Sequence, residues 1–478
     1  MAYPTILEKY GSLSATGFAK EVTFGTPVAA TTFLPMISNT MEEDPGWFAP
    51  HLMQGLRDLQ VYNLYGEAKF NGTINGPIFP ANAIQTLSAA IGADNLTGAG
   101  ITGTITTPTS TTLNGSTIAG ATTVVLTSAT GFATGQEVII DTGGIQEIRR
   151  ITNVATNTLT LQDALVYAHN SGVTAVTGVT TTLSAPSIAT ATSVTVTSAT
   201  GISNGTIIQI DVNSVAGSLT SEVRKVTNVV STTLTLDQAL VYAHASGAVV
   251  TIVQAPFTHI IQEQNTLPSL TVEKNAGGYQ SLQFAGCRVN KYEMKAPTGN
   301  SAVEVSMELM GQSVAVLGSP TAISVSTDVP FVFAEANLLF FNTLRTDVHN
   351  VSVSIENGVK ETYTYSNFHG PSFLTPVTLH VMGAVDVVWS SYNDTTYGDF
   401  NRLINGTLGT LIFTLVHPAS GGTITITLPQ IVVSKFAQDI KMEDVILANL
   451  SYEASRPLSG LQQYTIQAQV ANAVYLPY

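Results

Sequence analysis

The sequence predicts a mainly β protein: two β-sandwich or barrel domains, each with a short helix, and two small all-β repeat domains inserted into the first. Three observations predict this. Thr, Ser, Val and Gly are abundant while charged residues make up 10% of the chain, against about 25% in ordinary soluble domains. Short runs alternate apolar and polar residues between Gly- and Pro-containing turns, as half-buried strands do. Residues 96–256 contain an internal repeat, which indicates small inserted domains.

The clearest alternation lies near residue 305. Four apolar side chains share one face of the predicted strand: Val303, Val305, Met307 and Leu309. Three polar side chains take the other face: Glu304, Ser306 and Glu308. Upstream, a strand at 258–261 leads into a Leu267-Pro268 corner, and Gly286 is predicted to be a bulge because the apolar phase shifts after it.

The N-terminal part contains a predicted strand at 21–24, a strand pair within 66–78, and a helix after Pro80 that Gly92 ends. Residues 38–65, between the first two, form a long segment without clear period. The segment combines acidic and large apolar side chains: Glu42, Glu43, Asp44, Trp47, Phe48 and Met53. It is either a loop folded onto its own core or an arm that packs on a neighbouring subunit, with the acids as a polar rim. The composition favours the arm.

The interrupting stretch is a tandem repeat. Ala164 to His169, reading ALVYAH, recurs unchanged as Ala239 to His244. The run from Glu147 to Val154 recurs in similar form from Glu222 to Val229. We therefore expect a linker and first β repeat at 96–182 and a second at 183–256. The first domain then comprises 1–95 and 257–320, because an inserted domain leaves and returns at one loop.

Residues 331–478 repeat the order of elements of the first domain. Strands at 351–356 and 377–389 precede a short helix ended by Gly406. A strand at 408–416 follows, and then a second predicted corner at Leu428-Pro429. Two closing strands are expected near 432–450 and 464–470. The match between the halves lies in element order and not in sequence identity.

Composition excludes several classes of function. The net charge of −14 opposes adhesion to nucleic acid. The single cysteine, Cys287, excludes an intrachain disulfide and is expected to be a small buried side chain. The N-terminus lacks the features of a secretory signal, and no run reaches the roughly 20 apolar residues of a spanning helix. We therefore expect synthesis in a cytoplasm and no membrane segment.

No catalytic, cofactor-binding or metal site is expected. His169 and His244 occupy equivalent repeat positions, but without a second ligand at suitable spacing they are expected to be packed or turn-forming. The Gly-x-Ser-x-Gly match around Ser203 is followed by a strand pattern instead of the helix that a nucleophile elbow requires. A carboxylate pair for hydrolysis, such as Glu42 and Glu43 or Glu443 and Asp444, shows no sign of a cleft.

One family resemblance accompanies these features. The run LPSLTVEKN from Leu267 to Asn275, followed by a Gly-Cys strand and the alternating strand, resembles the major tail tube proteins of long-tailed bacteriophages. Gly25-Thr26-Pro27-Val28 and the run from Gly66 to Gly72 resemble their opening. The resemblance covers residues 1–95 and 257–478. It implies tube-type domains and a non-enzymatic structural subunit of the virion tail, made in the host cytoplasm.

The resemblance also implies partners. In that family, β-sandwich domains join their sheets into rings, and stacked rings form a hollow tube that conducts DNA during genome ejection. Tape measure, tail terminator and tip proteins are the other implied partners, and DNA passes without specific binding. Two tube-type domains per chain predict a homotrimeric ring with pseudo-sixfold symmetry; a homohexamer with an outer second domain is the alternative. A carbohydrate-binding or adhesive β-sandwich protein is the second functional hypothesis, and a β-rich hydrolase is the third.

If the protein forms a tube, two sets of residues are candidates for its lumen and for the contacts between its rings. Glu304, Ser306 and Glu308 are candidates to face the lumen, where like charge lets a polyanion slide; a solvated outer face is the alternative. Contact between rings is assigned to the arm, with Glu42, Glu43, Asp44, Trp47, Phe48 and Met53 as candidates.

Overall fold

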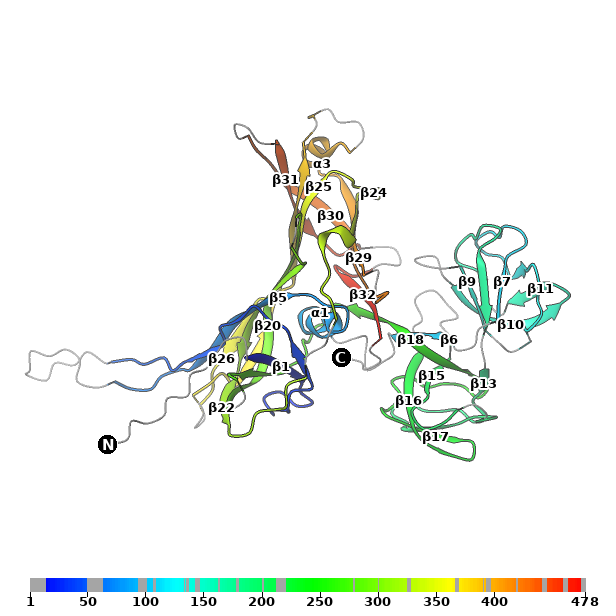
Figure 1. Ribbon diagram of the computed structural model, residues 1–478, viewed down its shortest axis with the longest axis horizontal. Helices are drawn as coiled ribbons and strands as arrows, with labels where there is room; N and C mark the ends of the chain where they lie inside the picture. Colours follow the sequence, from blue (N-terminus) through cyan, green and yellow to red (C-terminus); the bar gives the residue numbers. More distant parts are fainter. Residues whose placement is uncertain are drawn as a thin grey trace, which may run out of the picture. The chain divides into compact units, whose positions relative to one another are not determined.

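The computed structural model is mainly β and divides into two compact units, which are drawn in Figure 1. The first unit comprises Met1–Ala93 and Ile261–Val470, and the second comprises Asp94–Ile260 with Ala471–Pro477. The predicted mainly β fold is confirmed. The structure describes residues 14–49, 63–92, 101–105, 109–132, 134, 137–141, 147–161, 164–177, 180–199, 202–211, 221–277, 280–299, 301–324, 328–365, 369–389, 391–392, 397–417, 420–440, 445–458 and 463–473.

Strands and short α-helices build the described part of the first unit. Its first half contains β1 (Ala15–Lys20), β2 (Thr32–Leu34), β3 (Ser38–Asn39), β4 (Glu42–Asp44), β5 (Lys69–Pro77), α1 (Ala83–Ile91), β19 (Leu270–Asn275), β20 (Ser281–Pro297), β21 (Glu304–Gly311) and β22 (Ser313–Leu317). Its second half contains η3 (Phe333–Glu335), β23 (Ala336–Phe340), β24 (Thr343–Leu344), β25 (Val348–Glu356), β26 (Val359–Thr362), β27 (Phe373–Pro376), β28 (His380–Val388), α3 (Asp399–Asn405), β29 (Leu408–Val416), β30 (Thr423–Asp439), β31 (Leu447–Ala454) and β32 (Gln467–Asn472).

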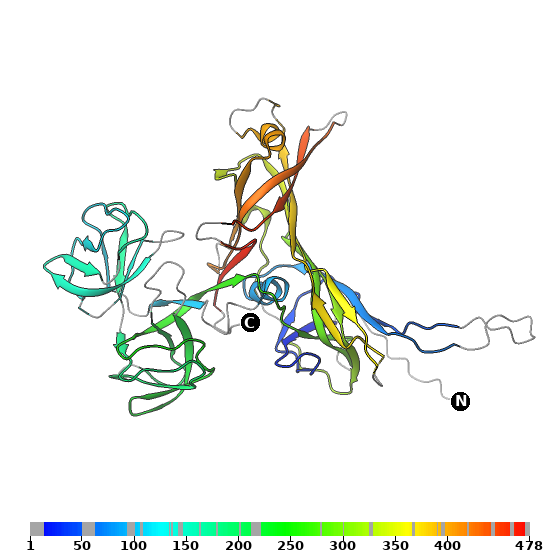
Figure 2. The same ribbon diagram turned by 180° about the vertical axis from the view of Figure 1, so that it is seen from behind.

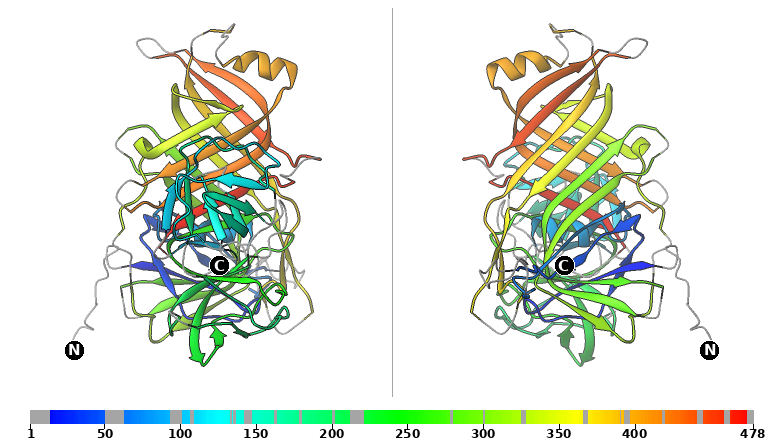
Figure 3. Two further views of the ribbon diagram at one scale, coloured as in Figure 1. Left: turned by 90° about the vertical axis from the view of Figure 1, so that its right-hand side faces the viewer. Right: turned by 90° about the vertical axis from the view of Figure 1, so that its left-hand side faces the viewer.

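An antiparallel sheet connects the two halves of this unit. Along it, β5 pairs with β21, β21 with β20, and β20 with β25. The order continues from β25 to β28, β31 and β30. Figure 3 shows these strands side by side in the second half, in yellow and orange. The β20–β25 pair therefore makes one sheet of strands that belong to different halves of the chain.

The helix α1 forms where the apolar spacing predicts it. Ile84, Leu87 and Ile91 are all buried, and the N–H of Gly92 closes the last turn on the Ser88 carbonyl. The helix packs against β20, beside which Figure 2 shows it from the other side. Gly92 has φ 150°, a conformation that favours glycine and ends the helix.

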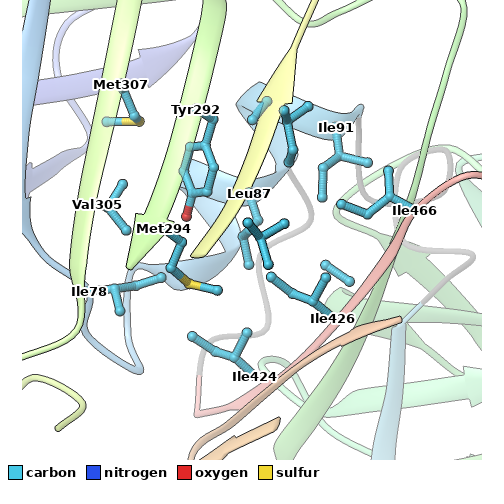
Figure 4. Close-up of a cluster of buried hydrophobic side chains, with 14 of the residues drawn as sticks. Ile78, Leu87, Ile91, Tyr292, Met294, Val305, Met307, Ile424, Ile426 and Ile466 are labelled. Carbon is cyan, nitrogen blue, oxygen red and sulfur yellow. The ribbon is translucent and has the colours of Figure 1, made fainter. Parts of the chain in front are cut away.

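Residues from both halves share one core. Figure 4 shows Ile78, Leu87 and Tyr292 of the first half close to Ile424 and Ile426 of the second. All five are essentially excluded from solvent. Burying a side chain of this size contributes roughly 1.5–3 kcal/mol, so the two halves stabilise each other.

The two predicted irregularities have different outcomes. Gly286 has φ 66° and lies where the register of β19 with β20 shifts, so the predicted bulge is confirmed. The predicted corner at Leu428-Pro429 is wrong, because β30 continues through it. The register of β29 with β30 shifts there, and a bulge accepts a proline that cannot donate to the ladder. Leu267-Pro268 does lie between strands, after β18 (Val249–Gln262) and before β19.

Three local predictions near the N-terminus need correction. The strand runs from Ala15 to Lys20, and residues 21–24, predicted as a strand, begin a turn. The Glu21 carboxylate accepts hydrogen bonds from the N–H groups of Gly25 and Gly286, which fixes the turn. Residues 66–78 hold one nine-residue strand, β5, instead of a pair. The segment 38–65 is not irregular at its base, because β3 and β4 pair with β5.

The second unit contains the repeats, each built on six strands in one order. The first repeat is β7 (Thr109–Thr112), β12 (Thr174–Thr177), β9 (Glu137–Ile140), β10 (Glu147–Ala155), β11 (Thr158–Leu161) and β8 (Thr123–Val125). The second is β13 (Thr180–Thr182), β18, β15 (Ile207–Ile210), β16 (Glu222–Val230), β17 (Thr233–Leu236) and β14 (Ser193–Thr195). The strand β6 (Ile101–Ile105) adds to β18. The domain boundaries predicted from the sequence stay predictions.

Candidate assembly surfaces

The sheet of the first unit has one polar side, which we call the polar face. The opposite side carries buried residues such as Val305, Tyr292 and Val353. Because side chains alternate along each strand, the registers place one set of residues together. The polar face consists of Lys291, Glu293, Lys295, Glu304, Ser306, Glu308, Ser352, Ser354, Glu356, His380, Met382, Ala384, Asp386, Lys435, Asn449, Ser451 and Glu453.

The polar face has more acid than base. Among its residues are six carboxylates and three lysines. Lys291 Nζ lies 2.9 Å from Glu356 Oε1, and Lys295 Nζ lies 2.9 Å from Glu293 Oε1, so two lysines are ion-paired. The carboxylate of Glu356 raises the pKa of Lys291, which stays charged. A molecule that touches this face therefore meets net negative charge.

The three lumen candidates lie together on this face. Glu304 and Glu308 are exposed, and Ser306 between them is half-buried. They lie opposite Lys295, Lys291 and Glu293 of β20. Glu308 Oε1 also accepts a hydrogen bond of 2.9 Å from Asn290 Nδ2. Whether these residues face a lumen stays a prediction.

The arm candidates lie at the base of a hairpin made by β4 and β5. Glu42, Glu43 and Asp44 form β4 and are exposed. Trp47 is 62% exposed and Phe48 52%, although Phe48 bridges to Leu64 across the hairpin. Two large apolar side chains this exposed next to each other are typical of an interaction site. Met53 lies outside the described residues.

Aromatic contacts hold the base of the arm in place. The Trp47 and Tyr65 rings meet edge to face with centroids 5.2 Å apart, and Tyr65 meets His369 at 4.3 Å. Tyr65 Oη donates a hydrogen bond of 2.8 Å to Glu43 Oε1, which raises the pKa of Tyr65. The exposed apolar residues therefore stand on an ordered support.

Each repeat contains a largely buried cluster of four ionisable side chains. In the second repeat, His244 Nδ1 lies 3.2 Å from Asp211 Oδ2 and Nε2 lies 3.0 Å from Glu222 Oε1. Glu222 also pairs with Arg224. The first repeat has the same cluster: Asp141, Glu147, Arg149 and His169. The histidines are thus packed, as predicted, and their carboxylate partners were not foreseen.

The residues considered for catalysis have other roles. Ser203 lies in an exposed turn before β15, with no helix after it, and Gly201 lies outside the described residues. Cys287 is buried, and burial raises the pKa of its thiol. Within the described part of the chain, no group of three His, Cys, Asp or Glu side chains could hold a metal ion. None of the helices described there is long and apolar enough to cross a membrane.

The two halves of the first unit have strands that correspond in register. Sequence identity does not reveal this similarity. The long strand β20 shifts register against β21 at Asn290, and β30 shifts register against β31 at Ser434. The helix α1 packs on β20 and α3 on β30. The local signal is Val289-Asn290-Lys291-Tyr292 against Val433-Ser434-Lys435-Phe436. Two identical and two similar residues in register are too weak a signal to find from one sequence.

The edge strands correspond as well. Thr73 N–H donates to Thr40 Oγ1, and Ala384 N–H donates to Ser352 Oγ. Each hydroxyl donates in return to the carbonyl of the same partner. The segment β3–β4 thus lies against β5 as β25 lies against β28. The fold therefore contains two sets of four strands, β3–β4, β5, β21, β20 and β25, β28, β31, β30.

A β-rich chain with a polar sheet face and an exposed arm has the features of a structural assembly protein. A family model described as Phage tail tube protein matches residues 214–454, which is half of the chain. This protein belongs to that family. Its role is therefore structural, in the tail of a virion. None of the curated proteins matches it.

Proposed function

We propose that this protein is the repeating subunit of the tail tube: its chains close into rings, and the rings stack around a lumen through which DNA leaves the virion. One observation carries the proposal, the continuous antiparallel sheet whose one side is apolar and packed and whose other side is polar and acidic. Among the described residues, Glu42–Asp44 pair with β5 and Lys435–Gln438 pair with β31, and a strand edge left open beside such a pair is a template for pairing with further copies. The role is non-enzymatic.

In the tube, the polar face lines the lumen. Glu304, Ser306 and Glu308 then belong to a wall in which carboxylates outnumber lysines. DNA is a polyanion, and like charge lowers its affinity for the wall, whereas unpaired lysines would bind phosphates. The two ion pairs, Lys291–Glu356 and Lys295–Glu293, support this role because they neutralise lysines that would otherwise retain DNA.

Rings stack through the arm. Trp47 and Phe48 bury against the adjacent ring, and the acids Glu42, Glu43 and Asp44 lie at the edge of the contact. Aromatic side chains of this exposure lose much apolar area when covered, and such residues dominate interface energies. Tape measure protein inside the tube and terminator and tip proteins at its ends complete the set of partners.

The ring is a homotrimer with pseudo-sixfold symmetry. The two sets of four strands, with α1 and α3 on their long strands, support two tube-type domains per chain, so that three chains supply six. In the alternative, six chains form the ring and residues 331–478 lie outside it. The pairing of β20 with β25 favours the trimer, because it places both sets in one sheet.

Electron microscopy of the purified protein tests the proposal. Negatively stained samples, before and after concentration, are expected to contain hollow tubes of stacked rings. Image averages should show three repeat-unit knobs per ring. Six knobs with true sixfold density would overturn the trimer but not the tube. Monomers that bind a glycan array and never form rings would replace the tube by a carbohydrate-binding function.

A further inference from the structure

One strand pair within the chain is an example of the junction expected between neighbouring chains of the ring. We propose that Lys435–Gln438 of β30 pair antiparallel with the Met41–Asp44 edge of a second copy, with Lys435 opposite Asp44 of that copy. This seam rests on the proposed ring and specifies its partner strands and register.

The example is the pair β20–β25, which joins the two strand sets within one chain. Lys291 lies opposite Glu356, Glu293 opposite Ser354 and Met294 opposite Val353. The cross-strand pair Lys291–Glu356 is an ion pair of 2.9 Å. Opposite charges that face each other across strands stabilise a sheet and set its register.

Because the two strand sets correspond, this junction predicts which residues of two chains face each other. On one side, the register shifts at Asn290 and Ser434 make Lys435 the equivalent of Lys291. On the other side, the matching hydrogen bonds make Thr40 the equivalent of Ser352. Asp44 lies four residues after Thr40, and Glu356 lies four residues after Ser352. Asp44 therefore corresponds to Glu356. A lysine and a carboxylate therefore occur at both positions that the example requires.

Glycines at one equivalent position support the correspondence. Gly72 lies opposite Leu309, and Gly383 lies opposite Tyr452. A Cβ at Gly72 would overlap the backbone of Met41, and a Cβ at Gly383 would overlap the carbonyl oxygen of Ser352. In both sets the edge strand thus approaches its neighbour closely at the same point.

Each edge is paired on one side in the single chain. Glu42, Glu43 and Asp44 are exposed, whereas Met41 is buried and its N–H bonds to Asn39 Oδ1. Lys435–Gln438 pair with β31 on one side, and on the other side the register of β29 with β30 extends only as far as Val432. The β3–β4 edge pairs with β5. Its Met41 carbonyl accepts a hydrogen bond of 2.9 Å from Lys274 Nζ. A lysine at an edge hinders premature pairing, and this one releases Met41 when the N–H of Gln438 arrives.

Cysteine cross-linking in assembled tubes tests the seam. The variant Lys435→Cys with Asp44→Cys is oxidised and run on a denaturing gel. Directly opposite residues have Cα atoms about 4.5–5.5 Å apart, within the reach of a disulfide. The expected product is a ladder of covalent oligomers that ends at three chains. The native Cys287 is buried and does not contribute.

Two controls make the result specific. The pair Lys291→Cys with Glu356→Cys should cross-link within one chain and shift only its mobility. The pair Ala437→Cys with Asp44→Cys, two residues out of register, should cross-link at least tenfold less. Tubes that form while only the out-of-register pair cross-links would overturn the register. Tubes without any cross-link at either pair would overturn the seam and leave the proposed function intact.

Charge reversal gives an independent readout that does not need cysteines. Lys435→Glu or Asp44→Lys alone should lower the association constant roughly two- to fivefold per seam, as loss of an exposed ion pair does. The double reversal should restore it. If the two single reversals lower the association constant and the double reversal lowers it by the product of both factors, the proposed pairing is contradicted. If the wild-type chain forms no rings at all, the proposed function fails instead, which microscopy of the same sample reveals.

Discussion

At the scale of single residues, the buried cluster around His244 shows how charge is accommodated in a small β domain. Burial alone would lower the pKa of His244, but its hydrogen bonds to Asp211 and Glu222 outweigh burial and raise the pKa to about 9. The pKa of Glu222 is lowered, because its bonds to His244 and to the Val241 N–H, together with Arg224, overcome the cost of burial. Carboxylates only accept hydrogen bonds, so both His244 ring nitrogens donate and the ring is charged.

Replacing His244 by Gln should destabilise the second repeat. Removal of one partner from a buried charge cluster costs roughly 3 kcal/mol. The folded pKa lies above that of the unfolded chain, so the stabilisation is complete below about pH 6.5 and is lost as pH rises through about 9. Hydrogen exchange of β16 and β17 in the intact protein measures this opening free energy. The exposed His380→Gln is the control, and identical pH profiles for His244→Gln and wild type would contradict the charged cluster.

The lumen assignment is also decided at single residues. Glu304→Lys with Glu308→Lys should slow genome ejection, because both new lysines add to a wall that otherwise repels phosphates. The matched control is Glu304→Gln with Glu308→Gln, which removes charge without placing a lysine opposite Lys291 or Lys295. We expect the order wild type, Gln, Lys from fastest to slowest in a dye-release assay on particles. Equal ejection rates for all three would place these residues outside the lumen.

At the scale of elements, the arm separates ring formation from ring stacking. Trp47→Ser with Phe48→Ser leaves the Glu42–Asp44 strand intact while it removes the exposed apolar surface. Truncated interface aromatics commonly cost 2 kcal/mol or more each, so rings should form without elongating. Sedimentation and tube lengths in micrographs measure this. Leu458→Ser, at another fully exposed apolar position, should leave tube length unchanged; normal tubes from the arm variant would contradict stacking through it.

The close approach of strands at Gly383 is a second property of an element. A Cβ there would meet the Ser352 carbonyl, which belongs to the backbone and cannot move alone, and the Tyr452 hydroxyl. Gly383→Ala should therefore cost roughly 1–3 kcal/mol and lower the unfolding midpoint of the first unit. At Gly318 nothing lies within 4 Å of an added Cβ, so Gly318→Ala is a neutral control. Equal stability of Gly383→Ala and Gly318→Ala would show that the strands shift to accommodate the added methyl group at residue 383.

At the scale of the whole molecule, the repeats are predicted to decorate the outside of the tube. A chain that joins residue 95 to residue 257 through a short Gly-Ser linker should still form tubes, thinner by the missing knobs. Its core residues lie in the first unit, whose buried cluster contains no residue of the described repeats. Electron micrographs compare tube diameters. Loss of all soluble protein from this deletion would assign the repeats to the tube wall.

The sequence by itself determined the mainly β class, the helix that ends at Gly92, the bulge at Gly286 and the tandem repeats. Each of these depends on interactions between residues near one another in the chain: helical spacing, a positive φ that favours glycine, or a period of two. The local pattern wrongly predicted a strand at Glu21, because the Glu21 carboxylate accepts a hydrogen bond from the N–H of Gly286, far along the chain. It failed at Pro429 because a bulge against β29 accepts the proline.

Only the tertiary structure decided which strands are neighbours. The sequence predicted the polar alternation around Ser306, but its extension across six strands depends on pairs such as β20–β25, which join residues roughly 60 positions apart. The buried partners of His244 and the equivalence of Lys435 with Lys291 arise in the same way. Strand pairing is set by contacts across the sheet and not by the residues next in sequence, so alternation predicts a face while the registers decide what that face contains.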